Sequence, residues 1–226
     1  MTSDKVALLF DIDGTLIITD GAGATSWKLA FMDLYGIPAD IDKYSDTGMT
    51  DPEVARRTFT ALLGHNPSPG EFSRLLERRM HFLTQAVDEA DGYHVLPGVE
   101  ALLPKLIHRG YLLGLVTGNL EAAAHIKLAR ARLNRFFAFG GYGSDSPDRV
   151  ALTQVAMQRA AMVAGEPIAA EKFLSFGDTP NDVIAAHQAG IECVGVASHK
   201  YSVTELRDAG ADWVLGSLEE PLPLSP

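Results

Sequence analysis

The stretch KVALLFDIDGTL at residues 5–16 decides the fold. Residues 6–10 form a continuous apolar run of strand length, which is typical of a strand buried on both faces of a parallel sheet. Two acids, Asp11 and Asp13, follow the run, with Gly14 next. Ligands of open α/β sheets bind beyond the carboxyl ends of the strands. We therefore expect the two acids to lie where a ligand binds.

The pairing of these acids favours a bound cation. An isolated buried carboxylate costs free energy unless it is paired with a charge or bound to a metal. The alternative is that an acid here caps a helix or forms an Asx-turn at the start of the next segment. That alternative explains one aspartate more easily than both Asp11 and Asp13.

Length and charge limit the architecture and the partners. The chain has 226 residues, which is large for one compact domain but short for two full ones, so we expect one domain with a smaller insertion. The net charge of −10 argues against a nucleic-acid partner, because binding to the phosphate backbone needs a basic surface. A small anionic substrate held by a local cation stays compatible with this charge, and the oligomeric state stays open.

The same composition bears on the compartment. Cys193 is the only cysteine, so no intramolecular disulfide can form, which fits a reducing compartment. Asp11 and Asp13 interrupt the apolar run near the N-terminus, which therefore lacks the core of a signal peptide. No apolar stretch approaches the length that spans a membrane. We expect a cytoplasmic protein without a membrane partner.

The chain changes character between residues 19 and 95. Helical patterns occupy this segment without a clear strand, whereas strands and helices alternate after it. Such alternation predicts a doubly wound parallel sheet with helices on both faces, an α/β, Rossmann-like core. We expect residues 1–18 and 96–226 to form this core and residues 19–95 to form an inserted helical cap. Further strands are expected at 111–116, 136–139, 173–176, 191–196 and 213–215.

Polar residues follow two of these later strands. Thr117 and Asn119 come after one, and Asp178 and Asp182 come after another. If these strands neighbour the first one, carboxylates, a hydroxyl and an amide share one rim of the sheet. That set suits Mg²⁺, which binds one or two carboxylates together with substrate phosphate oxygens. Histidine and cysteine are missing from these strand ends, so zinc is disfavoured.

Two neighbouring carboxylates beside a phosphoryl group can divide the chemistry between them. One carboxylate can attack phosphorus and form an aspartyl-phosphate. The other can protonate the leaving oxygen and then activate water. A divalent cation would neutralise the charge that otherwise keeps a carboxylate away from a phosphate.

Three motifs resemble those of the haloacid dehalogenase-like hydrolases. They are DIDGTL at 11–16, TGN at 117–119 and GDTPND at 177–182, which look like motifs one, two and four of that family in order and spacing. The resemblance covers essentially the whole chain and points to the branch that contains phosphoglycolate phosphatases and β-phosphoglucomutase. Residues 19–95 take the place of the helical cap of that branch.

The resemblance implies a role for each motif residue. Asp11 would be the nucleophile and would also place a carboxylate oxygen on the metal. Asp13 would be the general acid/base and would give the metal its backbone carbonyl. The phosphoryl group would be held by Thr117, Gly118 and Asn119. Asp178 and Asp182 would complete the Mg²⁺ site, the latter as a ligand or as an acid behind the ligands.

The third motif departs from the family pattern. The family has a lysine there, often in Lys-Pro-x-Pro, whereas this chain has SPDR at 146–149. If the prolines align, Ser146 takes the place of the lysine. Arg149 is the nearest cation and is expected to reach the nucleophile and the phosphate, a task that suits its bidentate fork. The alternative is a solvated residue in the first turn of a helix.

The expected function is Mg²⁺-dependent hydrolysis of a small phosphorylated metabolite, a phosphoglycolate-like or sugar phosphate. Asp13 favours phosphate ester chemistry over dehalogenation, since a halide needs no proton. A phosphomutase of the β-phosphoglucomutase type is the alternative. A phosphonate hydrolase is less favoured, because Lys28 and Lys43 are the only cap candidates for a Schiff base. The intact acids argue against a non-catalytic binding protein.

The remaining polar residues carry weaker expectations. Residues 48–51, GMTD, either approach the substrate or simply start a helix. Most of the cap arginines are expected to form a solvated face; they are Arg56, Arg57, Arg74, Arg78 and Arg79. Thr179 and Asn181 are expected to serve the turn and the helix cap after Asp178. No role is assigned to His125, His187 or His199.

Overall fold

A six-stranded parallel sheet forms the centre of the molecule in this computed structural model, which describes residues 4–46 and 48–224. Its strand order is β5-β4-β1-β6-β7-β8. The strands are β1 (Ala7–Phe10), β4 (Leu112–Thr117), β5 (Phe139–Tyr142), β6 (Phe173–Gly177), β7 (Glu192–Val196) and β8 (Trp213–Leu215). The α/β fold expected from the alternation is confirmed.

Strand β1 pairs with β4 on one side and with β6 on the other. Ala7 lies opposite Leu112 in one neighbour and opposite Phe173 in the other. The three strands that end in polar motifs are therefore direct neighbours, which is the condition for their side chains to share one rim of the sheet. Because all three run parallel, their motifs meet at one edge of the sheet.

Helices cover both faces of the sheet, and the alternation of side chains along β1 explains why its run is wholly apolar. Leu8 and Phe10 pack with α4 and α5, whereas Ala7 and Leu9 pack with α6 and α7. A strand covered on both faces has no solvent side that would favour polar residues. The core helices are α4 (Val99–His108), α5 (Glu121–Ala129), α6 (Arg149–Ala164), α7 (Pro180–Gln188) and α8 (Val203–Asp208).

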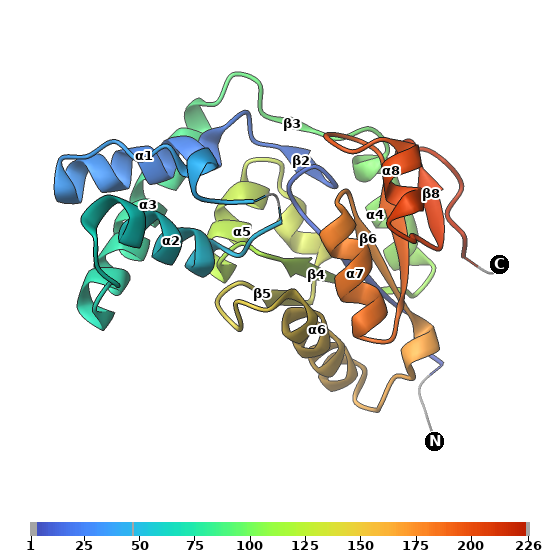
Figure 1. Ribbon diagram of the computed structural model, residues 1–226. Coiled ribbons are helices and arrows are strands. Elements are labelled where there is room, and N and C mark those ends of the chain that lie inside the picture. The colour runs from blue at the N-terminus through green and yellow to red at the C-terminus, as the bar shows by residue number, and fades with distance from the viewer. Residues whose placement is uncertain (1–3, 47, 225–226) are drawn as a thin grey trace.

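Three helices form the insertion, and Figure 1 shows them together at one side of the sheet. They are α1 (Ala22–Tyr35), α2 (Asp51–Leu63) and α3 (Pro69–Glu89). They share a core of their own around Trp27, Phe31 and Phe59. A second apolar cluster joins α1 and α3 to the start of α5 through Leu83 and Leu120, among others. The insertion is thus a cap with its own core that packs on the sheet domain.

Two short strands connect the cap to the sheet domain. Strands β2 (Ile17–Ile18) and β3 (His94–Val95) pair antiparallel, so the two connections run side by side. No strand was expected at either position, because two residues are too few for a periodic pattern. The ribbon brings the entry to the cap and the exit from it together.

One expected strand was misplaced. Residues 133–136 form the 3₁₀ helix Leu133–Phe136, and β5 begins only at Phe139. The edge strand contains Gly140 and Gly141, which lower its β propensity, while Phe136 and Phe137 pack on the core as partly buried aromatics. Two other 3₁₀ helices span Ile41–Lys43 and Ala170–Lys172.

Within the described ranges, no helix combines the length and the apolar character that crossing a bilayer requires.

Candidate active site

The end of β1 turns sharply and places its two acids differently. Asp11 is buried and its N–H donates to the Phe176 carbonyl at 2.9 Å. Gly14 has a φ of +81°, and a Cβ at this position would lie 2.2 Å from Asp178 Oδ2. Only glycine allows both the left-handed backbone and this close approach. The turn therefore lets Asp178 come up against the end of β1.

Three buried carboxylates converge here. One oxygen from each of Asp11, Asp178 and Asp182 lies within 4.8 Å of the others. Asp182 also caps α7, since its Oδ2 accepts from the Thr179 hydroxyl at 2.7 Å and from the Thr179 N–H at 3.0 Å. The expected capping role of Thr179 is confirmed, and Asp182 both caps the helix and contributes to the cluster.

Arg149 lies against this cluster rather than in solvent. It is the first residue of α6, and its Nη2 donates to Asp182 Oδ1 and lies 3.4 Å from Asp11 Oδ1. Its Nη1 donates to the Gly48 carbonyl of the cap at 3.1 Å. Desolvation alone would lower the pKa of Arg149, but Asp182 and Asp11 outweigh it and raise that pKa. The position inferred from the SPDR segment does bring a cation to the nucleophile candidate.

The cluster fits a divalent cation. Arg149 can neutralise only one of the three negative charges, and Asp178 Oδ1 is buried without a hydrogen-bond partner among the described residues. Desolvation, together with repulsion from Asp182, raises the pKa of Asp11 to about 7. Desolvation and repulsion from Asp11 raise the pKa of Asp178 to about 8. Buried carboxylates that repel one another in this way suit a hard cation such as Mg²⁺.

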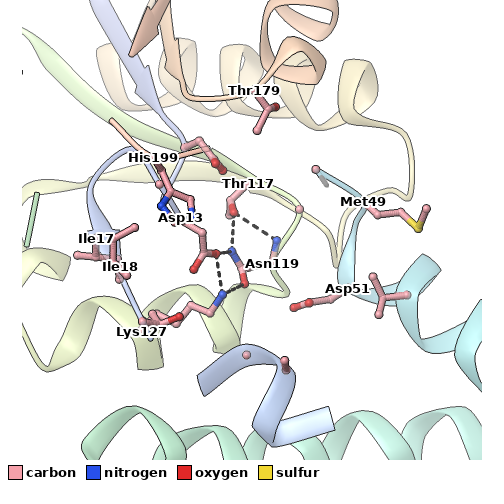
Figure 2. A pocket seen from close by; sticks show the side chains of 18 of the residues that line it. Asp13, Ile17, Ile18, Met49, Asp51, Thr117, Asn119, Lys127, Thr179 and His199 are labelled. Carbon is pink, nitrogen blue, oxygen red and sulfur yellow. Dashed lines mark hydrogen bonds and ion pairs between the residues drawn. The ribbon is translucent and has the colours of Figure 1, made fainter. Parts of the chain in front are cut away.

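Asp13 belongs to a separate network, drawn in Figure 2. Its Oδ2 accepts from Lys127 Nζ at 2.6 Å and from Asn119 Nδ2 at 2.8 Å. Lys127 Nζ also donates to Asn119 Oδ1 at 2.7 Å. Asn119 Nδ2 and N–H both donate to Thr117 Oγ1. The Asp13 carboxylate thus lines the same cavity but has partners of its own and is not a member of the three-carboxylate cluster.

This network sets the proton affinity of Asp13. Burial alone would raise its pKa, but the charge and hydrogen bond of Lys127 and the hydrogen bond of Asn119 outweigh burial, so the pKa of Asp13 is lowered. Asp11 and Asp13 therefore shift in opposite directions although they are two residues apart. Divergent pKa values of this kind distinguish groups with different tasks in one site.

The start of α2 joins the cap to the loop that follows β4. The Asp51 N–H donates to the Gly118 carbonyl at 2.7 Å, and Asp51 Oδ2 accepts from the Leu120 N–H at 2.9 Å. A Cβ on Gly118 would lie 2.8 Å from the Met49 carbonyl oxygen. Of the two expectations for residues 48–51, the helix start is confirmed, since α2 begins at Asp51. Gly48, Met49 and Asp51 also line the cavity, and their approach to a substrate stays a prediction.

Arg79 departs from the expectation of a solvated arginine face. Arg56, Arg57 and Arg74 are exposed as expected, but Arg79 is only 1% exposed. Its Nη1 donates to Asp51 Oδ2 at 2.6 Å. The signal was present in the sequence, because Arg79 falls at a spacing of four residues from Leu75 and Leu83 on the apolar stripe of α3.

Lys127 was also missed. It lies on the buried side of α5 together with Ala123, Ala124 and Leu128. A lysine among apolar positions at helical spacing is costly to bury without a partner, and this was the available signal. Only the tertiary structure shows that the partner is Asp13.

A cavity of about 570 Å³ is lined by most of these groups. Its walls come from the sheet edge, the β2 ribbon and the cap, including Asp11, Asp13, Arg149, Asp178, Ile17, Trp27, Met49 and Arg79. Thr117, Gly118 and Asn119, expected to hold a phosphoryl group, line it as well. So does His199, to which no role was assigned. Asp182 stands behind Arg149, as a buried member of the cluster.

Comparisons with known proteins agree with this geometry. The sequence profile of the haloacid dehalogenase-like hydrolases matches residues 8–196. A phosphoglycolate phosphatase of Pseudomonas syringae pv. tomato is 32% identical over 199 residues, covering 84% of this chain and 68% of the relative. One from Neisseria meningitidis is 29% identical and covers 95% of this chain and 91% of its own.

A solved structure of similar fold is a predicted phosphoglycolate phosphatase from Haemophilus somnus. It aligns with a TM-score of 0.71 at 19% identity and covers 96% of both chains. The profile spans the β1 motif, both later strand-end motifs and the cap between them. The chain therefore belongs to the haloacid dehalogenase-like hydrolases, in a form with a helical cap.

Proposed function

We propose that this protein is a Mg²⁺-dependent phosphatase that hydrolyses a small phosphate monoester, phosphoglycolate or a close analogue, through an aspartyl-phosphate. The supporting observation is that Asp11 and Asp13 lie in different surroundings within one site. Asp11 lies beside Arg149 and the other carboxylates, whereas Asp13 faces the cavity from the Lys127 network. In this proposal residues 1–18 and 96–226 are the catalytic core and residues 19–95 are the cap.

Asp11, Asp178 and Asp182, with the backbone carbonyl of Asp13, would hold the metal ion. A bound Mg²⁺ supplies charge neutralisation for a phosphate that approaches the carboxylates. Arg149 would stabilise the phosphoryl oxygens as well, because its Nη2 lies only 3.4 Å from the Asp11 oxygen Oδ1. Thr117, Gly118 and Asn119 orient the same group from the loop after β4.

Two displacement steps complete the reaction. An oxygen of Asp11 forms a bond to phosphorus while the bond from phosphorus to the ester oxygen breaks, and Asp13 gives its proton to the leaving oxygen. A dianionic phosphate beside Asp13 favours the protonated form of that acid before this step. Water then loses a proton to Asp13 and attacks phosphorus, which releases phosphate and restores the Asp11 carboxylate.

The names of the relatives support the substrate class. The relatives from Pseudomonas and Neisseria are phosphoglycolate phosphatases, and the alignment with each covers most of this chain. The cap forms one wall of the cavity, which has room for a small ester. Closure of the cap over a bound ester would exclude bulk water during the first step and so favour attack by Asp11.

Phosphate release over a panel of small esters, with and without Mg²⁺, tests the proposal. We expect Mg²⁺-dependent turnover that falls by at least about 10³-fold in Asp11→Asn, since the amide cannot form the intermediate. Glucose 1-phosphate separates hydrolysis from the alternative, because a phosphomutase would yield glucose 6-phosphate rather than free phosphate. Equal turnover by Asp11→Asn and the unmodified protein would refute the mechanism.

A further inference from the structure

We propose that the cap end of the cavity is a carboxylate subsite, formed by the N-terminus of α1 and by Arg79, which selects phosphate esters whose leaving group carries a carboxylate. This inference rests on the proposed phosphatase function. It assigns the recognition of the leaving group to residues that have no part in the phosphoryl chemistry.

The first turn of α1 is open toward the cavity. Gly21 precedes the helix and provides no side-chain cap, and the first turn has no acidic residue. Gly21, Gly23 and Ala24 line the cavity. The N–H groups and the dipole at the start of a 14-residue helix attract an anion. Asp20 lies just before this helix end and also lines the cavity, but its Oδ2 accepts from the Gly92 N–H at 3.0 Å. A ligand with negative charge would therefore complete the helix end.

Arg79 supplies an independent observation at the same end. Its side chain is 1% exposed, lines the cavity and lies with its guanidinium 4.4 Å from the centre of the Trp27 ring. Asp51 accepts from Nη1, but Nε is buried without a hydrogen-bond partner in the described part of the chain. A guanidinium has five N–H donors. Arg79 therefore keeps donor capacity that Asp51 does not use.

Asp51 does not cancel this capacity. The same oxygen that pairs with Arg79 also accepts from the Leu120 N–H at 2.9 Å. Its negative charge is thus shared between the guanidinium and the backbone of the loop after β4. The Trp27 ring adds a second contact to the guanidinium, a cation–π interaction at 4.4 Å. The arginine is held in place rather than left to fold back onto a single partner.

The subsite lies on the leaving-group side of the reaction. A Cβ on Gly23 would be 3.9 Å from Lys127 Nζ, and Lys127 Nζ is 2.6 Å from Asp13 Oδ2. Figure 2 shows Lys127 and Asp13 together on one side of the cavity. Since Asp13 protonates the leaving oxygen, a group bound at α1 and Arg79 belongs to the alcohol and not to the phosphate. A short carboxylated alcohol matches this arrangement.

The test compares two esters of similar size in each variant. We expect Arg79→Met to lower the ratio of kcat/KM for phosphoglycolate to kcat/KM for ethyl phosphate by about 10- to 100-fold, the worth of a charged hydrogen bond. Arg79→Lys should restore part of the ratio. Arg78→Met is the matched control, because Arg78 is next in sequence but pairs with Asp33 on the outside of the cap.

A second pair of variants tests the subsite even if the Arg79 variants fold poorly. Gly23 allows a side chain, since a Cβ there meets only Lys127 Nζ at 3.9 Å. Gly23→Asp would place a carboxylate at the helix start and should lower the same ratio, whereas the equally large Gly23→Asn should lower it much less. Inhibition by free glycolate should weaken in parallel in Arg79→Met and Gly23→Asp.

The outcomes separate the two proposals. If the unmodified protein releases phosphate from no ester, the proposed function fails and the subsite fails with it. If it hydrolyses esters but the ratio is unchanged in Arg79→Met and Gly23→Asp, the subsite alone is refuted. Equal losses for both esters would mean that Arg79 acts only on the structure, which also overturns the inference.

Discussion

The cations around the two acids are the decisive feature at the scale of single residues. Arg149 lies beside Asp11, and Lys127 lies beside Asp13. Arg149 pairs with both Asp182 and Asp11, whereas Lys127 pairs with Asp13, and this separates the electrostatic environments of two acids that are only two residues apart. Position 146 is a serine, and the positive charge in the site comes instead from two other residues, Arg149 of α6 and Lys127 of α5.

Lys127→Met should weaken proton donation by Asp13. Without Lys127, the Asp13 carboxylate loses the 2.6 Å partner that fixes its position. The pKa of Asp13 also rises, which makes the protonated group a weaker acid toward the leaving oxygen. We expect kcat for an alkyl phosphate to fall about 10²-fold, in the range typical of lost acid–base catalysis. p-Nitrophenyl phosphate, whose leaving group needs no proton, should lose much less. Lys105→Met is the control, because Lys105 lies on the exposed face of α4.

Similar losses for both substrates would contradict this role for Lys127 and would indicate a general defect of the site.

Arg149→Met should destabilise the protein in a pH-dependent way. It leaves the buried Asp11 and Asp182 without their cation, which costs about 3 kcal/mol in comparable pairs. Arg149 lowers the pKa of Asp11, so its removal raises that pKa further. At pH 5 Asp11, whose pKa is raised to about 7, is protonated and needs no partner, whereas at pH 8 it is charged. The loss should therefore be larger at pH 8.

Urea unfolding of the metal-free protein at the two pH values measures this difference. Arg149→Lys should recover part of the stability at pH 8. A loss of the same size at both pH values would show that Arg149 stabilises the fold through packing and not through charge.

At the scale of elements, the start of α2 couples the cap to the sheet domain. Asp51 receives hydrogen bonds from Arg79 of α3 and from Leu120 after β4, and its own N–H donates to Gly118. Thr50 adds a contact of 3.5 Å to the Pro147 carbonyl. The loop that would hold the phosphoryl group is thus built partly by the cap. Movement of the cap would change that loop directly.

Asp51→Asn should loosen this connection. It removes the negative charge that compensates buried Arg79, and charged hydrogen bonds of this kind contribute about 1.5–3 kcal/mol. We expect a loss of stability within that range and faster hydrogen exchange at the Leu120 amide, which donates to the Asp51 side chain, and at the amide of residue 51, which donates to the Gly118 carbonyl. Asp33→Asn is the control, because Asp33 pairs with Arg78 on the exposed side of the cap.

An unchanged exchange rate at the amides of residue 51 and Leu120 would show that the loop does not depend on the cap contact.

At the scale of the whole molecule, the sheet order places three motifs at one edge. The strands β4, β1 and β6 are adjacent, and their motifs lie about 100 and 60 residues apart in sequence. The cap closes over the same edge. Binding of a cation to the three carboxylates would therefore join the ends of β1 and β6 to the start of α7.

Mg²⁺ should stabilise the folded protein accordingly. At a concentration of about 100 times its dissociation constant, binding adds about 2.7 kcal/mol to the free energy of unfolding. Asp178→Asn should abolish most of this gain. Protonated carboxyl groups do not bind Mg²⁺, and the pKa values of Asp11 and Asp178 are raised to about 7 and about 8. The gain should thus grow from pH 5 to pH 8.

Thermal unfolding with and without Mg²⁺ measures this gain, with Ca²⁺ as a comparison cation. A gain that is equal in Asp178→Asn would place the ion elsewhere on the acidic surface.

The sequence by itself determined the class of the fold and the identity of the main candidates. A wholly apolar run followed by two acids is a local signal, and local signals suffice for a buried strand and its polar end. The same holds for the helices of the cap, whose apolar stripes repeat at helical spacing. Residues 136–139 were misplaced because a glycine-containing edge strand has little local pattern.

The tertiary structure alone decided which charges meet. Lys127 and Asp13 are 114 residues apart, and Arg79 and Asp51 come from different helices. Burial of a lysine or an arginine on an apolar stripe can be suspected from spacing, but its partner depends on strand order and on how the cap packs. Coulomb interactions act through space, so no pattern along the chain specifies them.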